Sequence, residues 1–243
     1  MAPVRVNAVI QARLSSTRLQ GKVLRPLGDR SVLSWVIRAA AATHNVDRVI
    51  LATSTSDDDD LVAEEAARCG AEVVRGPLDD VLARYLMAVD AHPCDAVVRL
   101  TADCPLHDPA LIAQVVGMWR ADPTIDYASN ILVRHYPRGL DTELVRTSVL
   151  AEQGGIPTGP HREHVTPNIY TNPDTYRCAG VVSAVDNSDL RITLDTAEDA
   201  SLLDAVVAEL GTEIPTWETV VALLRARPDI AALNKSVSQK PLP

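Results

Sequence analysis

Three cations fall within the ten residues from Arg13 to Lys22, directly after the first predicted strand. Arg13, Arg18 and Lys22 are interspersed there with hydroxyl side chains, and Gly21 permits a close approach of the backbone. Such a loop suits a polyphosphate, because cations and backbone N–H groups can share its negative charge. The spacing matches neither a Walker A loop nor a GxGxxG dinucleotide fingerprint. A solvated basic turn is the alternative interpretation.

Two aspartates follow other predicted strands. Asp103 comes directly after one apolar strand-like run, and Asp195 comes directly after another. Mg²⁺ usually takes one or two carboxylates and leaves its other positions to substrate phosphates and water. Two such carboxylates facing a cationic loop predict a site for phosphoryl or nucleotidyl transfer. Asp103 taken alone would better fit a turn cap ahead of Asp108 and Pro109. After Asp195, we expect Thr196 to be the N-cap of the next helix, with Asp199 complementing the helix dipole.

A third group of polar residues is a candidate for contacts with a second substrate. Asp141 and Glu143 lie two apart in a predicted strand, so they share one face, as an acceptor-hydroxyl site or as a solvent-facing pair. Arg162 and His164 fall in the segment 161–164, whose two histidines are three apart and do not form the HExxH zinc motif. We therefore expect no zinc site there, and Arg162 or His164 would contact an anionic substrate.

The elements that must position these residues alternate along the first 120 residues. Short β-rich apolar runs predict strands, and apolar residues at three- and four-residue spacing predict helices. The predicted strands are 4–10, 46–53, 71–74 and 96–100, and the predicted helices are 31–42, 61–69, 81–91 and 109–119. The fold class is therefore α/β, with right-handed βαβ units and a mostly parallel sheet covered on both faces. Ligands of such sheets bind beyond the carboxyl ends of the strands.

The pattern changes between residues 126 and 185, where Pro- and Gly-bearing loops separate strand-like runs. These runs are 127–134, 140–145 and 176–185. They predict an antiparallel insertion, after which the αβ pattern returns with a strand end at 191–194 and helices at 198–210 and 215–227. We expect a single domain over residues 1–233 and a flexible tail over 234–243.

Composition narrows the class of protein. The chain has 243 residues, 47% of them hydrophobic, and its 23 basic and 32 acidic residues give a net charge of −9. A nucleic-acid partner is not expected, because phosphate binding favours net positive charge, and the aromatic residues available for base stacking make up only 3% of the chain. The first residues lack a secretory pattern, and the apolar runs are too short to cross a bilayer. The four cysteines form no CxxC pair, which indicates reduced thiols. We expect a cytoplasmic protein with no membrane partner.

Five blocks of sequence, in order, resemble the cytidylyltransferase family, which includes the acylneuraminate and 3-deoxy-manno-octulosonate cytidylyltransferases. The blocks are residues 10–24, 75–85, 99–105, 161–166 and 194–199. Within the family, the chain is most similar to the spore-coat polysaccharide biosynthesis branch. Gln20 is a departure, because the family usually has Pro before this Gly. The change affects the stiffness of the loop and leaves its phosphate contacts in place.

The resemblance implies a three-layer α/β/α nucleotidyltransferase fold and a homodimer formed through the strands of region 126–185. It implies that an acceptor hydroxyl attacks the α-phosphate of CTP, so that CMP is transferred and pyrophosphate leaves. Arg13 and Lys22 would hold the triphosphate and stabilise the charge of the transition state. Asp103 and Asp195 would bind Mg²⁺, and the catalytic residues would be Arg13, Lys22 and Asp103.

The same resemblance places the two substrates. CTP would contact the loops after the first strands, at Ala12, Arg13, Lys22, Thr53, Ser54, Arg75 and Asp80. The acceptor would be a sugar acid, an amino sugar or a phosphonate, and would contact Asp141, Glu143, Arg162 and His164. A phosphonate would want further cations, which Arg134, Arg138 and Arg162 would supply.

Two other function classes are weighed against this one. A glycosyltransferase with a nucleotide-sugar donor shares the sheet type and often has a metal-binding DxD motif. The DxD-like run of this chain, 57–60, opens a helix and fits a stabilised helix N-terminus. A non-catalytic nucleotide-binding module would have lost reactive residues, whereas Lys22, Asp103 and Asp195 are all present. The sequence therefore favours the cytidylyltransferase over both.

Overall fold

A central sheet organises the computed structural model, which describes residues 4–16 and 18–238. Within these residues the sheet has seven strands, in the order β5-β4-β1-β6-β8-β7-β9. Their bounds are β1 (Val6–Gln11), β4 (Arg48–Ser54), β5 (Glu72–Gly76), β6 (Ala96–Thr101), β7 (Tyr127–Ser129), β8 (Glu143–Arg146) and β9 (Cys178–Gly180). A separate hairpin joins β2 (Pro26–Leu27) to β3 (Arg30–Ser31).

The first four strands of the sheet run parallel, as the alternation of strands and helices predicts. β1 lies in the middle of this group, with Val9 opposite Ile50 of β4 on one side and Arg99 of β6 on the other. Because these strands are parallel, the segments that follow them leave the sheet at the same edge. The predicted α/β fold is confirmed.

The region 126–185 differs in part from the antiparallel insertion that its sequence predicts. Only β8, among the described strands of the sheet, runs antiparallel, pairing with β6 on one side and β7 on the other. β7 pairs with β9 in parallel, and all three strands extend the main sheet. Local alternation of polarity shows that a segment is extended but does not encode the direction of its partner. The predicted strand at 191–194 is reduced to a single bridge between Arg191 and Arg138.

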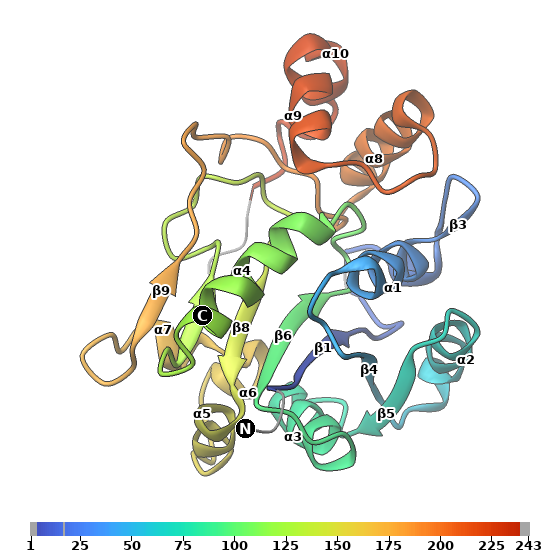
Figure 1. Cartoon of the computed structure of the whole chain (residues 1–243). Coiled ribbons are helices and arrows are strands. Elements are labelled where there is room, and N and C mark those ends of the chain that lie inside the picture. The colour runs from blue at the N-terminus through green and yellow to red at the C-terminus, as the bar shows by residue number, and fades with distance from the viewer. Residues whose placement is uncertain (1–3, 17, 239–243) are drawn as a thin grey trace.

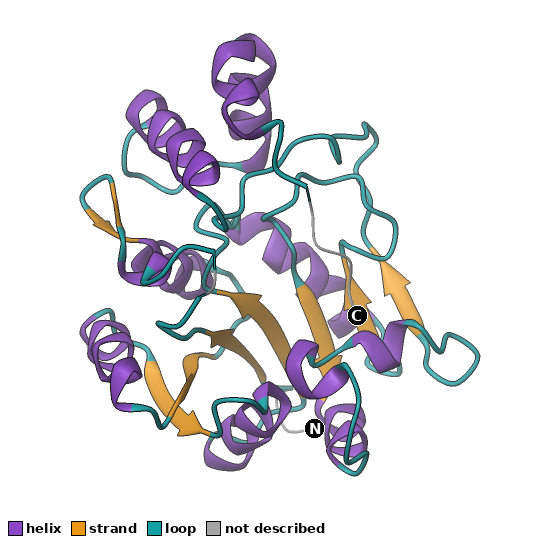
Figure 2. Ribbon diagram, turned by 180° about the vertical axis from the view of Figure 1, so that it is seen from behind, coloured by secondary structure: helices purple, strands orange, loops and turns teal. Residues whose placement is uncertain are grey.

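Helices cover both faces of the sheet and make three layers (Figures 1 and 2). Alternate side chains of β1 point to opposite faces, so Ala8 and Ile10 join one apolar cluster and Val9 joins the other. The first cluster contains residues of α1 (Val32–Ala42), α2 (Asp60–Arg68), α4 (Pro109–Ala121), α8 (Ala197–Leu210) and α9 (Trp217–Ala226). The second contains residues of α3 (Val81–Ala91), α5 (Thr147–Gly154) and α7 (Pro167–Tyr170).

Side-chain caps fix the starts of the principal helices. In each case an oxygen of the residue before the helix accepts a hydrogen bond from a backbone N–H of the first turn. These N-caps are Ser31 for α1, Asp80 for α3, Asp108 for α4, Thr196 for α8 and Thr216 for α9. Thr196 forms a full capping box with Asp199, which confirms it as the N-cap predicted for that helix.

The last described residues pack against the body of the fold. The short helix α10 (Pro228–Ala231) lies beside α8 and α9 at the top of Figure 1. The next short helix, η3 (Ala232–Asn234), contacts α8 and α10. Asn234, where the sequence predicts the start of a flexible tail, is only 4% exposed. Residues 239–243 of that predicted tail lie outside the described residues. Among the described helices, none combines the length and the apolar character needed to cross a membrane.

Gly139 occupies a position that other residues would strain. Its φ is +108°, and a Cβ atom there would lie 2.7 Å from the backbone of Ile192 and Thr193. We expect Gly139→Ala to lower the free energy of unfolding by about 1–3 kcal/mol, because it combines an unfavourable φ with a backbone clash. Gly117→Ala in α4 is the control, since nothing lies within 4 Å of its Cβ position and Ala favours a helix. Urea unfolding tests the pair, and equal midpoints would contradict this account.

Candidate active site

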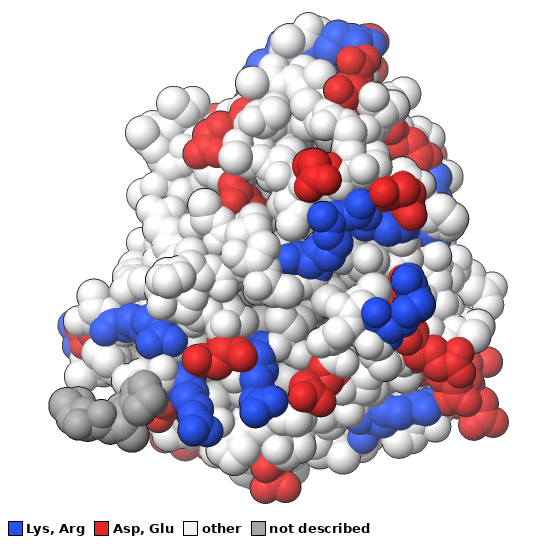
Figure 3. Space-filling view, turned by 45° about the vertical axis from the view of Figure 1, so that its right-hand side comes forward, with Lys and Arg blue, Asp and Glu red and all other residues white. Residues whose placement is uncertain are grey.

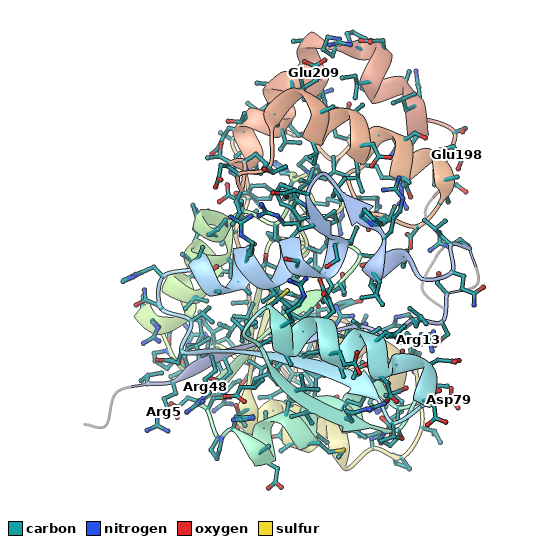
Figure 4. The ribbon with its side chains drawn as sticks, turned by 90° about the vertical axis from the view of Figure 1, so that its right-hand side faces the viewer. Arg5, Arg13, Arg48, Asp79, Glu198 and Glu209 are labelled. Carbon is teal, nitrogen blue, oxygen red and sulfur yellow. The ribbon has the colours of Figure 1, made fainter. Side chains whose placement is uncertain are left out.

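The chemistry-bearing residues gather at the edge where the parallel strands end. In Figure 4, Arg5 and Arg48, at the beginnings of β1 and β4, lie at one side of the molecule. Arg13, Asp79 and Glu198, which follow β1, follow β5 and open α8, lie at the opposite side. This is the edge at which open α/β sheets bind their ligands.

A polar cavity of about 590 Å³ opens at this edge. Its lining comes from the loop after β1, the start of α3, the end of β6, α6 (His161–His164) and the segment before α8. The lining residues are Gln11, Ala12, Arg13, Ser15, Ser16, Arg18, Gln20, Lys22, Val23, Val81, Arg84, Thr101, Ala102, Asp103, Glu163, His164 and Asp195. Another cavity, of about 630 Å³, lies between the β2–β3 hairpin and α2, and none of the predicted site residues lines it. The polar cavity is therefore the candidate site.

Lys22 joins the two predicted metal ligands. Its Nζ lies 2.7 Å from Asp103 Oδ2 and 2.7 Å from Asp195 Oδ1, so one ammonium group bridges carboxylates that are distant in sequence. Asp195 is also 2.9 Å from Arg18 and 2.9 Å from Arg191. The structure thus brings the cationic loop and both predicted metal ligands into one cluster.

The charges of this cluster stabilise one another. Burial alone would disfavour the ammonium, but Asp103 and Asp195 outweigh it and raise the pKa of Lys22 above its usual value. Burial likewise disfavours the charged form of Asp103. The attraction of Lys22 is stronger than this effect and holds the pKa of the Asp103 carboxyl below its usual value. Lys22 is therefore a cation and Asp103 an anion at neutral pH.

The two aspartates fit a divalent cation that shares its coordination with a substrate. They already converge on one cationic group, and their hard oxygen atoms are the ligands that Mg²⁺ prefers. No group of three or more His, Cys, Asp or Glu side chains suited to a metal occurs in the described part of the chain. A site that keeps positions for phosphate oxygens and water needs no more than two carboxylates.

Local contacts shape the cationic loop around the cavity. Gly21 adopts a left-handed φ of +68°, which turns the chain into the short helix η1 (Lys22–Leu24), and its N–H donates to Leu14 O at 3.1 Å. The Leu14 N–H donates to Asp59 Oδ1 at 2.6 Å. Asp59 belongs to the acidic run 57–60, which opens α2 as predicted and also ties down this loop. Thr17 of the loop lies outside the described residues.

Several residues predicted to contact a nucleotide do not line the cavity. Thr53 and Ser54 are fully buried in β4, and Ser54 bonds to Asp59. Arg75 donates to the backbone of Ser54 and Ser56 and pairs with Asp60. Position after a strand indicates the correct edge of the sheet, but the strand's pleat and the neighbouring turn decide where each side chain points.

Two predicted contacts pair with each other instead. Asp80 caps α3 with one oxygen and forms an ion pair with Arg162 through the other. Arg162 also donates to the backbone of Gly154. Asp80 and Arg162 therefore tie α3 to α6, whose His164 does line the cavity. Burial holds the pKa of His164 below its usual value, so its ring is neutral at pH 7.

The predicted pair Asp141 and Glu143 is divided between two environments. Glu143 is only 3% exposed, and its carboxylate accepts hydrogen bonds from Arg99, Tyr127 and Thr166. Glu143 is therefore held inside the sheet by three protein donors, and its predicted contact with an acceptor stays a prediction. Asp141 is half-buried and forms a two-point ion pair with Arg134, at 2.7 and 2.8 Å.

Sequence reasoning missed several cavity residues, among them Arg84 of α3 and Gln11 of β1. Arg84 lines the cavity and donates to the carbonyls of Pro77 and Leu78. Gln11, the last residue of β1, accepts from Arg99 at 3.1 Å. Arg84 lies four residues after the N-cap Asp80, a spacing that could have placed it on the same side of the helix.

His107 lies buried near this site and gives the fold a pH-dependent stability. Neither ring nitrogen has a hydrogen-bond partner in the described residues, and burial lowers the pKa of His107 to about 4. The unfolded chain binds this proton near its ordinary pKa of 6.5, so stability falls as pH drops from 6.5 to about 4. The full loss is about 3 kcal/mol, since each pKa unit corresponds to about 1.4 kcal/mol.

We expect His107→Leu to flatten this part of the stability profile, measured by urea unfolding between pH 4 and pH 7. His44→Gln is the control, because His44 is exposed. An unchanged slope in the His107 variant would assign the acid sensitivity to other groups.

Figure 3 shows basic and acidic side chains lying next to one another on the face turned toward the viewer. This face therefore carries charges of both signs.

Comparison with known proteins identifies the family to which this arrangement belongs. A family model described as cytidylyltransferase matches residues 7–208, which include most of β1, the cationic loop, Asp103 and Asp195. The chain belongs to the cytidylyltransferase family. The spore coat polysaccharide biosynthesis protein SpsF of Bacillus subtilis is 32% identical over 234 residues, 92% of this chain and 95% of that protein.

Solved structures agree with this membership. A cytidylyltransferase from Leptospira borgpetersenii has a TM-score of 0.92 and 29% identity, covering 98% of this chain and all of that one. The CMP:2-keto-3-deoxy-manno-octonic acid synthetase complexed with CTP shares the fold, with a TM-score of 0.68. Its sequence is 16% identical, and the match covers 85% of this chain and 99% of that one. This cytidylyltransferase is thus a CTP-using nucleotidyltransferase, and the predicted resemblance, fold and enzyme class are confirmed.

Proposed function

We propose that this cytidylyltransferase transfers CMP from CTP to a small acidic acceptor, with Mg²⁺ as cofactor and pyrophosphate as the second product. The observation that carries the proposal is the bridge from Lys22 to Asp103 and Asp195 at the polar cavity. In this bridge, a cation that would bind phosphate and two candidate metal ligands belong to one hydrogen-bonded group. Nucleotidyl transfer needs this combination, because charge develops on the α-phosphate and on the leaving pyrophosphate.

The cationic loop would bind the triphosphate. Arg13, Arg18 and Lys22 all line the cavity, together with the hydroxyls of Ser15 and Ser16. When CTP binds, Lys22 and Arg18 would leave their ion pairs and donate to phosphate oxygens. The charge of the transition state would then be shared among preorganised donors, and the protein would supply mainly positioning and electrostatic stabilisation.

Asp103 and Asp195 would hold Mg²⁺ once Lys22 has turned toward the phosphates. The bound cation would polarise the α-phosphate and help the acceptor hydroxyl to lose its proton. Asp103 lies two residues after β6 and Asp195 two residues before α8, so each ligand is next to a regular element of the fold. Such placement suits an in-line displacement, in which small misplacements cost rate.

The acceptor would lie on the β8 side of Asp103, beside the ion pair of Arg134 with Asp141. Arg138 lies close to this pair, and its pKa is lowered by burial and by the charge of Arg134. A half-buried cation in this position favours an anionic partner, such as the carboxylate of a sugar acid or a phosphonate. His164, on the cavity wall, would be a further contact.

The relatives support this assignment by what their names describe. SpsF of Bacillus subtilis is a spore coat polysaccharide biosynthesis protein, and the fold relative described above was solved with CTP. By analogy we propose an acceptor that is a building block of a surface polysaccharide. A homodimer formed through region 126–185 stays a prediction, which sedimentation equilibrium would test.

Pyrophosphate release tests the proposed function directly. The protein is incubated with Mg²⁺, a pool of sugar acids, amino sugars and phosphonates, and CTP, UTP, ATP or GTP in turn. We expect release with CTP that EDTA abolishes, and fractionation of the pool then identifies the acceptor. Equal release with all four nucleotides would contradict CTP selectivity, and release that persists in EDTA would contradict the metal requirement.

A further inference from the structure

The two oxygens of Asp195 have different kinds of partner. Oδ1 faces the cavity loop and contacts Lys22 at 2.7 Å and Arg18 at 2.9 Å. Oδ2 accepts from Arg191 at 2.9 Å, and the Arg191 side chain is only 8% exposed. Lys22 and Arg18 come from the cationic loop, whereas Arg191 holds the carboxylate from behind. One oxygen is therefore anchored, and the other faces the cavity.

Arg191 is itself fixed by a second carboxylate. Its Nε and one terminal nitrogen donate to the two oxygens of Asp199, each at 2.9 Å, in a two-point ion pair. Asp199 is fully buried and also accepts from the backbone N–H of Asp195 at 2.9 Å and of Thr196 at 3.2 Å. Asp199 thus holds the backbone of Asp195 directly and its carboxylate through Arg191.

A residue near the end of the described chain completes this arrangement. Asn234 Nδ2 donates to Asp199 Oδ1 at 2.8 Å and to the Arg191 carbonyl at 3.1 Å. Asn234 lies beyond residues 7–208, the part matched by the family model. The C-terminal segment therefore returns to the back of the candidate metal site.

We infer that Arg191, Asp199 and Asn234 are positioning residues for Asp195, which they hold with Oδ1 toward the divalent cation. The inference rests on the proposed function and deepens its metal site. Partners behind a ligating carboxylate fix its orientation and tune its affinity for the metal. The charge balance supports this role, because Asp199 offsets the charge of Arg191 and leaves that of Asp195 available to a cation. Charge-assisted hydrogen bonds in a buried setting also keep the geometry rigid.

The competing explanation is that these residues only fasten the C-terminal segment to the sheet. That role would change stability and leave metal binding unaltered. The protein offers a matched control in Arg225, which lies on α9 and donates to Asp189 at 2.6 and 2.7 Å and to Asn187 at 3.0 Å. Arg225→Gln removes a comparable two-point ion pair and lies away from the cavity.

Electron paramagnetic resonance of Mn²⁺, added to the full chain with saturating CTP, measures the metal site without an acceptor. We expect Arg191→Lys to raise the Mn²⁺ dissociation constant about 10- to 100-fold, which is the usual effect of substituting a residue that holds a metal ligand in place. Asn234→Ala should raise it by a smaller factor, and Arg225→Gln should leave it unchanged. CTP affinity measured in EDTA should change little in all three. Thermal unfolding confirms that each variant is folded.

The outcomes separate this inference from the proposed function. If Arg191→Lys does not fold, Asn234→Ala carries the test. An unchanged Mn²⁺ dissociation constant in the folded variants, together with weaker binding in Asp195→Asn, would overturn the positioning role and leave the proposed metal site standing. Unchanged binding in Asp195→Asn would overturn the metal site and, with it, the role of Arg191.

Discussion

Replacing Asp103 by Ala should lower kcat for CTP-dependent pyrophosphate release about 1000-fold or more. A catalytic cation stabilises several kcal/mol of transition-state charge, and about 1.4 kcal/mol corresponds to a tenfold change in rate. Asp103 Oδ2 is one of the two carboxylate oxygens that converge on the Lys22 ammonium. Its removal would leave Asp195 as the one remaining acid of that pair, which is too little to hold the metal against the triphosphate.

The fold should survive this change. The backbone of Asp103 stays in place through its carbonyl, which accepts from Leu194 N–H at 2.8 Å and from the Thr193 hydroxyl at 3.1 Å. Circular dichroism and thermal unfolding check this point. Asp204→Ala is the control. Asp204 belongs to α8, pairs with Arg25 and does not line the cavity. Wild-type activity in Asp103→Ala, with Mg²⁺ still required, would remove Asp103 from the metal site.

Replacing Lys22 by Met should lower kcat/KM for CTP about 100- to 1000-fold, the usual effect of removing one preorganised donor to a developing charge. The same change should also destabilise the free protein. Without the ammonium, Asp103 and Asp195 lose the cation that bridges them, so the free energy of unfolding falls. Mg²⁺ without nucleotide should then raise the midpoint of unfolding more for the variant than for the wild type, because it replaces the missing cation.

Two measurements check these effects: steady-state pyrophosphate release, and thermal unfolding with and without Mg²⁺. Lys235→Met is the matched control, because Lys235 is exposed and lies outside the cavity lining. Equal stabilisation of Lys22→Met and wild type by Mg²⁺ would show that Lys22 and the divalent cation do not share the same carboxylates. Undiminished kcat/KM would remove Lys22 from the triphosphate site.

The sequence predicts the elements of the parallel half of the sheet closely. The helix predicted at 81–91 is α3 with the same bounds, because Asp80 provides a cap and the apolar residues follow a helical period. The edge of the sheet that carries the site follows from the same alternation. Lys22, Asp103 and Asp195 could therefore be placed at one edge before their contacts were known.

Individual contacts are less accessible to such reasoning. Glu143 reads as a surface acid from its alternation with Asp141, yet it pairs inside the sheet with Arg99 of β6. The antiparallel pairing of β8 with β6 creates that contact, and nothing local in residues 140–146 specifies it. Thr53, Ser54 and Arg75 lie outside the cavity lining for a related reason, since the pleat of β4 and the neighbouring turn decide where these side chains point. Their predicted contacts with CTP stay predictions.

The sequence by itself determined the alternation of strands and helices, the cationic loop and the two candidate metal ligands Asp103 and Asp195, because each is encoded by local spacing and residue type. Tertiary structure alone decided that Lys22 bridges Asp103 and Asp195, and that Arg191, Asp199 and Asn234 stand behind them. These contacts join residues up to 173 positions apart. Their geometry depends on how strands pair and how the C-terminal segment packs, which no local pattern contains.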